Sequence, residues 1–214
     1  MSDSAAPGRR ERKKAETRAK IFGTALRLIR KRGFDAVTVD EICEAADVAK
    51  RTFFLHFPSK HELIHEYGAQ IRALVSETLE GDTSSAESRL RRAVQVMAAR
   101  AEENAELVRL AVGETFGSGH AAGDVLDQGR TLALDLAEIV RDGQKSGELR
   151  TSFDPRVLSG AIVATYLSLV AEWARFGEPE LEVGIAQMLD VVLGGARAAP
   201  RSSRSGSGRG ARTR

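Results

Sequence analysis

Residues 38–64 read TVDEICEAADVAKRTFFLHFPSKHELI, and this stretch decides the fold. Thr38 followed by Glu41 has the spacing of a capping box, which predicts a short helix over 39–46. A second short helix is expected over 48–56, and it stops before Pro58 because proline cannot donate a backbone hydrogen bond. Two short helices joined across the turn ADV predict a helix-turn-helix, whose second helix can enter the major groove of DNA.

The side chains of this stretch divide into two sets. One set has the spacing needed to close a small core beneath both helices: Ile42, Ala46, Val48, Phe53 and Phe57. The other set is left on the opposite side of the second helix: Lys50, Arg51, Thr52 and Leu55. Cations and hydroxyls there can bond to bases or phosphates, and an exposed leucine can contact a thymine methyl.

The rest of the sequence predicts an all-α protein of about nine helices. Apolar residues recur at three- and four-residue spacing in the long intervals between the five prolines. Ser59 and Glu62 repeat the capping-box spacing, Asp154 is a natural N-cap before Pro155, and Gly33 and Gly177 are expected helix stops. The expected helices cover 16–32, 39–46, 48–56, a segment that opens after Pro58, 85–101, 104–116, 121–147, 155–176 and 180–194.

Composition and charge narrow the class of protein. The chain has 214 residues, of which 42% are hydrophobic, so it is expected to be globular. Its one cysteine excludes an intrachain disulfide, and no signal peptide or membrane helix is readable, which favours the cytoplasm. Net charge is +6 over residues 1–60, −10 over 61–195 and +6 over 196–214. This asymmetry favours a polyanion, most simply nucleic acid, as the partner of the first part; two solvated tails are the alternative.

The stretch GFDAVTVDEICEAADVAKRTFFLHFPSKHELI resembles the N-terminal domain of the TetR family of transcriptional regulators. The resemblance rests on a Gly-aromatic pair, a Thr-Val helix start, an Ala-Ala-x-Val turn, a Thr-aromatic pair and a His-Phe-x-x-Lys ending. The remainder resembles the family in its helical layout, its length and the turn GQKSGELR. The expected domains are a disordered basic arm over 1–15, a DNA-binding domain over 16–64, a helical effector-binding and dimerisation domain over 65–195, and a disordered basic tail over 196–214.

The resemblance implies a role in DNA binding for individual residues. Thr38, His56 and Lys60 are expected to contact phosphates. Lys50, Arg51 and Thr52, in the helix expected over 48–56, are expected to face the bases. Phe54 stands where the family usually has tyrosine, which leaves stacking or apolar contact. Asp47 occupies a turn position where glycine is common, and aspartate tolerates a left-handed backbone there. The expected DNA-binding set is Thr38, Lys50, Arg51, Thr52, Phe54, Leu55, His56 and Lys60.

Asp40 lies on the exposed side of the first short helix. Its carboxylate could accept a hydrogen bond from a cytosine amino group, or it could only stabilise the helix N-terminus. The second reading is preferred.

Two further sets of residues are expected in the larger domain. The apolar side chains of the last two helices are the expected dimer surface: Ile162, Tyr166, Leu169, Val170, Trp173, Ile185, Leu189 and Val192. The resemblance implies that two such helix pairs form a four-helix bundle. A ligand pocket is expected to be lined by Met97, Val108, Phe116, Leu136, Tyr166 and Trp173. For both sets the alternative is that these side chains only fill the core of one subunit. Charged residues near the ends of 155–176 favour burial of this apolar helix over a membrane span.

Other candidate sites are set aside. Cys43 is read as a packed thiol, and the closely spaced His56, His61 and His65 as no metal site. No cofactor and no catalytic motif is recognised. The expected function is a ligand-responsive, homodimeric regulator that binds a pseudo-palindromic operator in double-stranded DNA and acts as a repressor. A regulator without a ligand, an activator, and a helical protein that binds nucleic acid without sequence preference remain alternatives; an enzyme is the least favoured.

Overall fold

The computed structural model describes residues 8–116, 122–177 and 180–197, with the side chains of 111–128 left out. This part of the chain is all-α, as the sequence predicts, apart from one isolated bridge between Leu149 and Arg197. Its nine helices are α1 (Arg9–Arg32), α2 (Val39–Ala45), α3 (Lys50–His56), α4 (Glu62–Leu79), α5 (Ala86–Glu103), α6 (Ala105–Phe116), α7 (Ala122–Ser146), α8 (Pro155–Phe176) and α9 (Leu181–Ala196).

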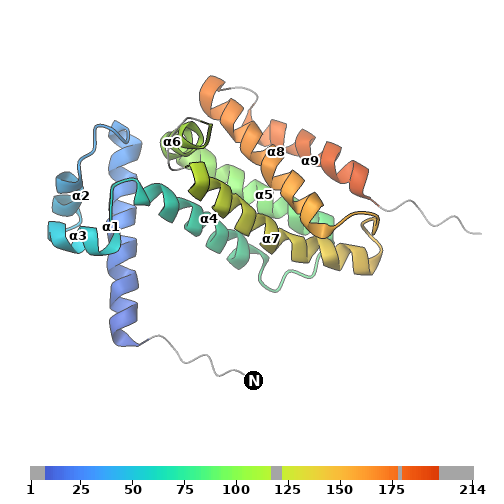
Figure 1. Cartoon of the computed structure of the whole chain (residues 1–214), viewed down its shortest axis with the longest axis horizontal. Coiled ribbons are helices and arrows are strands. Elements are labelled where there is room, and N and C mark those ends of the chain that lie inside the picture. The colour runs from blue at the N-terminus through green and yellow to red at the C-terminus, as the bar shows by residue number, and fades with distance from the viewer. Residues whose placement is uncertain (1–7, 117–121, 178–179, 198–214) are drawn as a thin grey trace, which may run out of the picture.

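The first three helices form a unit at one end of the molecule. Figure 1 shows α1 crossing that end, with α2 and α3 on its outer side and α4 leading away into the larger helical body. Ile42, Ala46, Phe53 and Phe57 are fully buried, and Val48 is half-buried, as their spacing predicts. Because these side chains hold α2 and α3 against α1, the outer face of α3 has a fixed direction.

The prediction of a disordered arm over 1–15 is wrong for residues 9–15. Helix α1 begins at Arg9 and continues without a break into the buried part of the helix. Arginine, lysine and alanine are good helix formers, and the Glu11 carboxylate accepts a hydrogen bond from the Gly8 amide at 3.2 Å. The apolar periodicity used to predict the start at 16 could not detect an exposed helical segment.

One predicted helix start is confirmed and another is wrong. The Thr38 hydroxyl accepts a hydrogen bond from the Glu41 amide at 3.2 Å, and the Glu41 carboxylate accepts one from the Thr38 amide at 2.8 Å. The predicted box of Ser59 and Glu62 does not form, because α4 begins only at Glu62 after a turn. There the Glu62 amide donates to the backbone oxygen of Ser59 at 3.3 Å.

The body is built around α8, an apolar helix of 22 residues. Asp154 caps α8 by accepting a hydrogen bond from the Arg156 amide at 2.8 Å, and Gly177 ends it in a left-handed conformation. Among the described helices, α8 alone has the length and hydropathy of a possible membrane span, which is weak evidence for one. It packs along α7 and against α6 and α9, as a core helix does.

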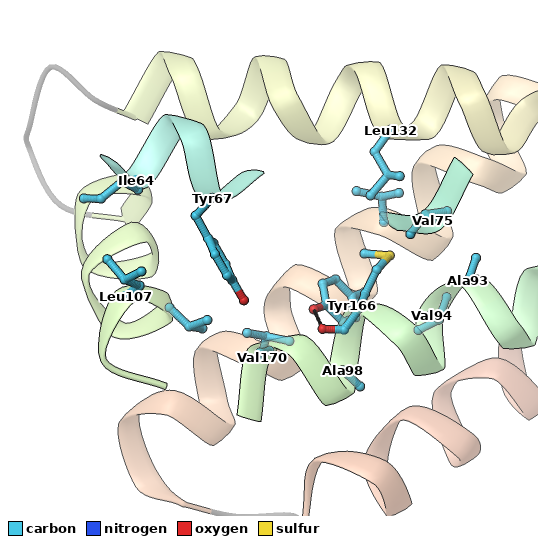
Figure 2. Close-up of a cluster of buried hydrophobic side chains, with 14 of the residues drawn as sticks. Ile64, Tyr67, Val75, Ala93, Val94, Ala98, Leu107, Leu132, Tyr166 and Val170 are labelled. Atoms are coloured by element: carbon cyan, nitrogen blue, oxygen red, sulfur yellow. Dashed lines mark hydrogen bonds between the residues drawn. The ribbon is translucent and has the colours of Figure 1, made fainter. Parts of the chain in front are cut away.

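Figure 2 shows the buried apolar cluster that joins the helices of the body. Tyr67 and Val75 of α4 face a cluster that includes Leu107 of α6, Leu132 of α7 and Tyr166 of α8. The two tyrosine hydroxyls are satisfied by backbone oxygens of α5: Tyr67 donates to Arg100 at 2.9 Å and Tyr166 to Met97 at 3.1 Å. Burial raises the pKa of both phenols. Each tyrosine therefore ties its own helix to α5.

The stretch GQKSGELR, which includes the end of α7 and the turn after it, contacts the start of α5 and the end of α9. The Glu148 carboxylate accepts hydrogen bonds from the Ala86 and Glu87 amides, each at 2.8 Å, and so caps the start of α5. Gly143 provides the close approach, since a Cβ built there lies 2.6 Å from that of Ala86. The Arg150 amide bonds to the Ala196 oxygen at 2.9 Å, which anchors the end of α9.

Candidate nucleic-acid interface

The turn between α2 and α3 has the backbone geometry expected of a helix-turn-helix. Asp47 has φ of +50°, so it adopts the left-handed conformation predicted for this position. The Val48 amide donates to the Cys43 oxygen at 3.0 Å, which closes the turn. Asp47 therefore adopts a backbone conformation that glycine adopts most readily.

The outer face of helix α3 carries both charged and apolar side chains. Lys50 and Arg51 are exposed and Thr52 is half-buried. Leu55 is 73% exposed and Phe54 is 44% exposed, although both are apolar. The opposite side of the helix is locked in the core through Phe53 and Phe57. An exposed leucine beside two cations suits a surface that contacts DNA, because the leucine can contact thymine methyl groups and the cations can bind bases or phosphates.

Asp40 and Lys50 form an ion pair that joins α2 to α3. The Lys50 Nζ lies 2.8 Å from one Asp40 carboxylate oxygen and 3.1 Å from the other. Both side chains are more than half exposed. Asp40 thus has an intramolecular partner that neither of the two sequence interpretations included, and the pair places a negative charge beside the first cation of α3.

Thr38 is exposed, but its hydroxyl is already used within the capping box. The hydroxyl donates to the Glu41 carboxylate at 2.9 Å and accepts from the Glu41 amide. Hydrogen bonds from Thr38 and from Arg32 lower the pKa of Glu41 to about 2. A phosphate at this helix start would have to compete with the Glu41 carboxylate for the same donors.

His56 is not at the surface, contrary to the prediction that it binds a phosphate. Its side chain is 6% exposed, and its Nδ1 has no hydrogen-bond partner among the described residues. Burial, together with the charges of Arg18 and Lys14, lowers the pKa of the imidazole. As the last residue of α3, His56 turns inward because the helix ends against α1, which the spacing of polar residues alone did not reveal.

Lys60 is half-buried and has a structural role that the sequence analysis missed. Its Nζ donates to the backbone oxygens of Phe34 and Val37 at 2.9 and 3.0 Å and lies 4.2 Å from the centroid of the Phe34 ring. These contacts hold the loop between α1 and α2 against the turn before α4. The expected phosphate contact is therefore replaced, for two of the three ammonium donors, by carbonyl oxygens.

Arg18 of α1 is a second residue that the sequence analysis missed. Its guanidinium lies 4.3 Å from the Phe57 ring centroid, pairs with Glu66 at 2.7 Å, and donates to the His56 backbone oxygen. Arg18 therefore fixes α1 against the end of α3 and the start of α4. The basic run RRERKK was the available signal that this part of the chain matters, but it gives no indication of those contacts.

Helices α1 to α3 form the DNA-binding unit, which is called the reading head below. It is joined to the body through the buried side-chain amide of Asn104. Arg30 of α1 donates to the Asn104 side-chain oxygen through Nε at 3.0 Å and Nη2 at 2.8 Å. Asn104 lies in the break between α5 and α6, is almost fully buried, and donates in turn to the Arg100 backbone oxygen at 2.8 Å. Because Tyr67 of α4 bonds the same Arg100 oxygen, α1, α4 and the α5–α6 break meet at one point.

The residues predicted for the dimer surface are mostly in the core of one subunit. Five of them are buried: Ile162, Tyr166, Val170, Ile185 and Leu189. Leu169, Trp173 and Val192 are half-buried. The prediction followed apolar periodicity, and periodicity marks the inward face of a helix first. The outward faces of α8 and α9 instead carry Val157, Val183 and Val191, of which Val191 is 78% exposed.

The predicted ligand-lining residues are also core residues. Met97, Val108, Leu136 and Tyr166 are buried, and Trp173 is half-buried. The hydrogen bond from Tyr166 to the Met97 oxygen brings these two residues together. Phe116 falls outside the residues whose side chains are described.

Comparisons with known proteins agree with this geometry. Residues 21–67 match the family model described as bacterial regulatory proteins, tetR family, and residues 87–177 match the model described as tetracyclin repressor-like, C-terminal domain. The first model covers the helix-turn-helix and the start of α4. The second covers most of the helical body.

Curated relatives are named transcriptional regulators. The HTH-type transcriptional regulator TcmR of Streptomyces glaucescens is 46% identical over 57 residues, which are 27% of this chain and 25% of TcmR. The chain thus spans about a quarter of that relative. The uncharacterized HTH-type transcriptional regulator YhgD of Bacillus subtilis is 23% identical over 174 residues, which cover 75% of this chain and 86% of YhgD.

Solved structures share the whole fold. FadR of Thermus thermophilus, a TetR family transcriptional repressor solved in complex with lauroyl-CoA, is 27% identical with a TM-score of 0.68. The match covers 86% of this chain and 97% of FadR. FadR of Bacillus halodurans has a TM-score of 0.66 at 19% identity, which shows the fold alone. On the helix-turn-helix geometry, the two family models and these relatives, the chain belongs to the TetR family of transcriptional regulators.

Proposed function

We propose that this protein is a homodimeric repressor that reads a pseudo-palindromic operator in double-stranded DNA and releases it when a small molecule binds to the helical body. The observation that carries the proposal is the outer face of α3. Lys50, Arg51 and Leu55 stand exposed on a helix whose other side is fully buried. A helix held this way can place its side chains against base edges in the major groove.

The outward faces of α8 and α9 support association of two copies. Val157 is 65% exposed and Val191 is 78% exposed, and Val183 is also open to solvent. A soluble protein rarely leaves several large apolar side chains on adjoining helices without a partner. A second copy that buried this face would pair two α3 helices. Two reading heads about 34 Å apart recognise half-sites one turn of DNA apart.

The body supports a small-molecule effector with an apolar group. Five helices, α4 to α8, contribute to the apolar cluster of Figure 2, which also contains the Tyr67 and Tyr166 hydroxyls. Thermus thermophilus FadR was solved with lauroyl-CoA and shares this fold, so acyl-CoA thioesters are the first class of effector to test. A ligand that binds one arrangement of α4 better than another would shift the reading heads by its differential affinity.

The contact between the reading head and the body can transmit a movement of the body helices to α1. Arg30 and Tyr67 both reach the α5–α6 break, through Asn104 and the Arg100 oxygen. Movement of α4 or α6 would therefore displace α1. The relatives are named regulators of transcription, so we place the protein in the cytoplasm, acting by binding rather than as an enzyme, with no membrane partner and no resident cofactor.

Binding without sequence preference is the second candidate. It is favoured by the basic sequences at both ends of the chain, which carry +6 over residues 1–60 and +6 over 196–214. Electrostatic contacts to phosphates alone give affinity that falls steeply with salt and does not depend on base sequence.

The test is selection of sheared genomic fragments by the full-length protein at about 150 mM salt with excess competitor DNA, followed by sequencing. We expect a two-fold symmetric motif. Arg51→Ala should enrich the motif much less strongly than the parent does, whereas Lys145→Ala, which removes a cation of α7 that pairs with Asp142, should select the same motif as strongly. Enrichment of no motif by dimeric, folded protein, with and without acyl-CoA, would support the second candidate.

A further inference from the structure

The first two turns of α1 form an exposed basic rod. Residues 9–16 carry five cations, Arg9, Arg10, Arg12, Lys13 and Lys14, against the two acids Glu11 and Glu16. Every residue from Arg9 to Glu16 is exposed. Figure 1 shows this half of α1 running beyond α3, clear of α4 and of the body. The rod therefore gains nothing from packing against the rest of the chain.

Electrostatics disfavour this rod in isolation. Cations occupy the N-terminal end of the helix, where the macrodipole favours anions. Arg9 and Lys13, and likewise Arg10 and Lys14, are four residues apart on one face, an arrangement of like charges that destabilises a helix. None of the five cations forms an ion pair with another described residue. A polyanion would remove all of these penalties together.

The rod has a fixed position relative to α3. Arg18 holds α1 through the Phe57 ring, Glu66 and the His56 oxygen, directly at the end of α3. Lys14 is close enough to influence the His56 imidazole. At about 1.5 Å per residue, the cations from Lys14 to Arg9 lie about 6 to 14 Å along the axis from Arg18. That reach matches a major groove about 12 Å wide, whose edges are phosphates.

We infer that residues 9–16 of α1 are a phosphate-binding arm, which contacts the DNA backbone beside the half-site that α3 reads. The inference rests on the proposed function, and it adds a second contact surface outside the helix-turn-helix. The arm has charge that complements DNA, and Arg18, two residues after it, contacts the end of α3. It would contribute affinity and salt dependence, while base preference would remain with Arg51 and its neighbours.

The test compares equilibrium binding by three full-length proteins to a selected duplex and to a scrambled duplex, at several salt concentrations. The arm variant is Lys13→Gln with Lys14→Gln, because glutamine keeps the helix propensity of lysine. The control is Arg141→Gln with Lys145→Gln, which removes the same charge from the C-terminal end of α7, where Arg141 pairs with Glu138 and Lys145 with Asp142.

For the arm variant, we expect the slope of log K against log salt to fall in magnitude by about 1 to 2 per protomer. Affinity at about 100 mM salt should fall roughly 3- to 10-fold on both duplexes, leaving their ratio unchanged. Lys13→Arg with Lys14→Arg should bind as the parent does.

Three results would overturn the inference, and they are distinguishable. If the parent protein prefers the selected duplex but the arm variant keeps the parent slope, the arm does not contact DNA and the proposed function stands. If the parent shows no preference for the selected duplex, the proposed function fails and this inference fails with it. An equal loss of slope in the control would also contradict a local contact, since it would mean that net charge alone is measured.

Discussion

Among the residues that the structure describes, Lys50 and Asp40 form the one ion pair between α2 and α3, with the Lys50 Nζ 2.8 Å from an Asp40 carboxylate oxygen. The pair has two opposite consequences. It holds the start of α3 against α2, and it places an anion on the surface that approaches DNA. Both side chains are well exposed, so the pair adds little to folding stability. Its larger effect is expected on DNA binding.

Asp40→Asn should therefore bind DNA more tightly than the parent protein. The substitution removes a negative charge from the interface and frees Lys50, so we expect affinity for any duplex to rise about 3- to 10-fold at low salt. Unfolding free energy should change by less than about 0.5 kcal/mol. Fluorescence anisotropy and urea unfolding measure the two quantities.

Glu138→Gln is the matched control, because it removes one exposed acid of α7 that pairs with Arg141. It should leave DNA affinity unchanged. Weaker binding by Asp40→Asn would show instead that Asp40 positions Lys50, or accepts a hydrogen bond from a base.

The limits of the sequence analysis are clearest at His56 and Lys60. The order of the short helices and the Thr38 cap follow from local spacing, the left-handed Asp47 follows from the family resemblance, and the structure has all three. The direction of a side chain at the end of a helix depends on the packing of other elements. His56 turns into the contact with α1, and Lys60 binds carbonyl oxygens of the loop after α1. Neither contact is encoded within its own segment.

The body shows the same limit on a larger scale. Apolar periodicity located α8 at the observed bounds and found the start of α9 within a residue. The residues that it marked for the dimer surface are mostly buried within one subunit. The residues left exposed, such as Val157 and Val191, lie beside apolar residues that are more buried, so periodicity alone does not distinguish them. They stand out only when burial is known.

Val157→Glu together with Val191→Glu should abolish dimerisation. Both side chains are exposed in one subunit, at 65% and 78%, so the subunit itself should fold normally. A charge buried in a subunit contact without a partner is strongly destabilising to that contact. Sedimentation of the variant at micromolar concentration should give the monomer mass, with the helical circular dichroism of the parent protein.

Leu134→Glu on α7 serves as the control, since Leu134 is also exposed but lies on another helix. This variant should sediment as the parent does. A dimer that survives both valine substitutions would place the subunit contact elsewhere.

Gly143→Ala should destabilise the body. A Cβ at this position lies 2.6 Å from the Ala86 Cβ and 2.8 Å from a Leu149 Cδ1, so α7 and the start of α5 must move apart. We expect the unfolding free energy to fall by about 1–3 kcal/mol, the usual cost of overpacking. Gly23→Ala, in the exposed middle of α1 with nothing within 4 Å, should raise it by about 0.5–1 kcal/mol. Equal effects of the two changes would contradict the close contact.

Stability of the DNA-binding head should decrease in mild acid through His56. Burial and two nearby cations lower the pKa of this imidazole in the folded protein. Below the unfolded pKa of about 6.5, the unfolded chain binds a proton that the folded one resists, so unfolding free energy should fall as pH falls through that value. His56→Leu should remove this part of the pH dependence between pH 7 and 5. Identical pH profiles of urea unfolding for both proteins would contradict it.

The central claim is that the exposed face of α3 reads base sequence. The most direct measurement is equilibrium binding to a selected duplex and to the same duplex with its half-site base pairs scrambled, at about 150 mM salt. The account predicts that the parent prefers the selected duplex by at least about 10³-fold. Arg51→Ala should lose much of that ratio, by about 10-fold or more, while retaining its fold. Equal affinity of the folded, dimeric parent protein for both duplexes, at every salt concentration tried, would contradict the account.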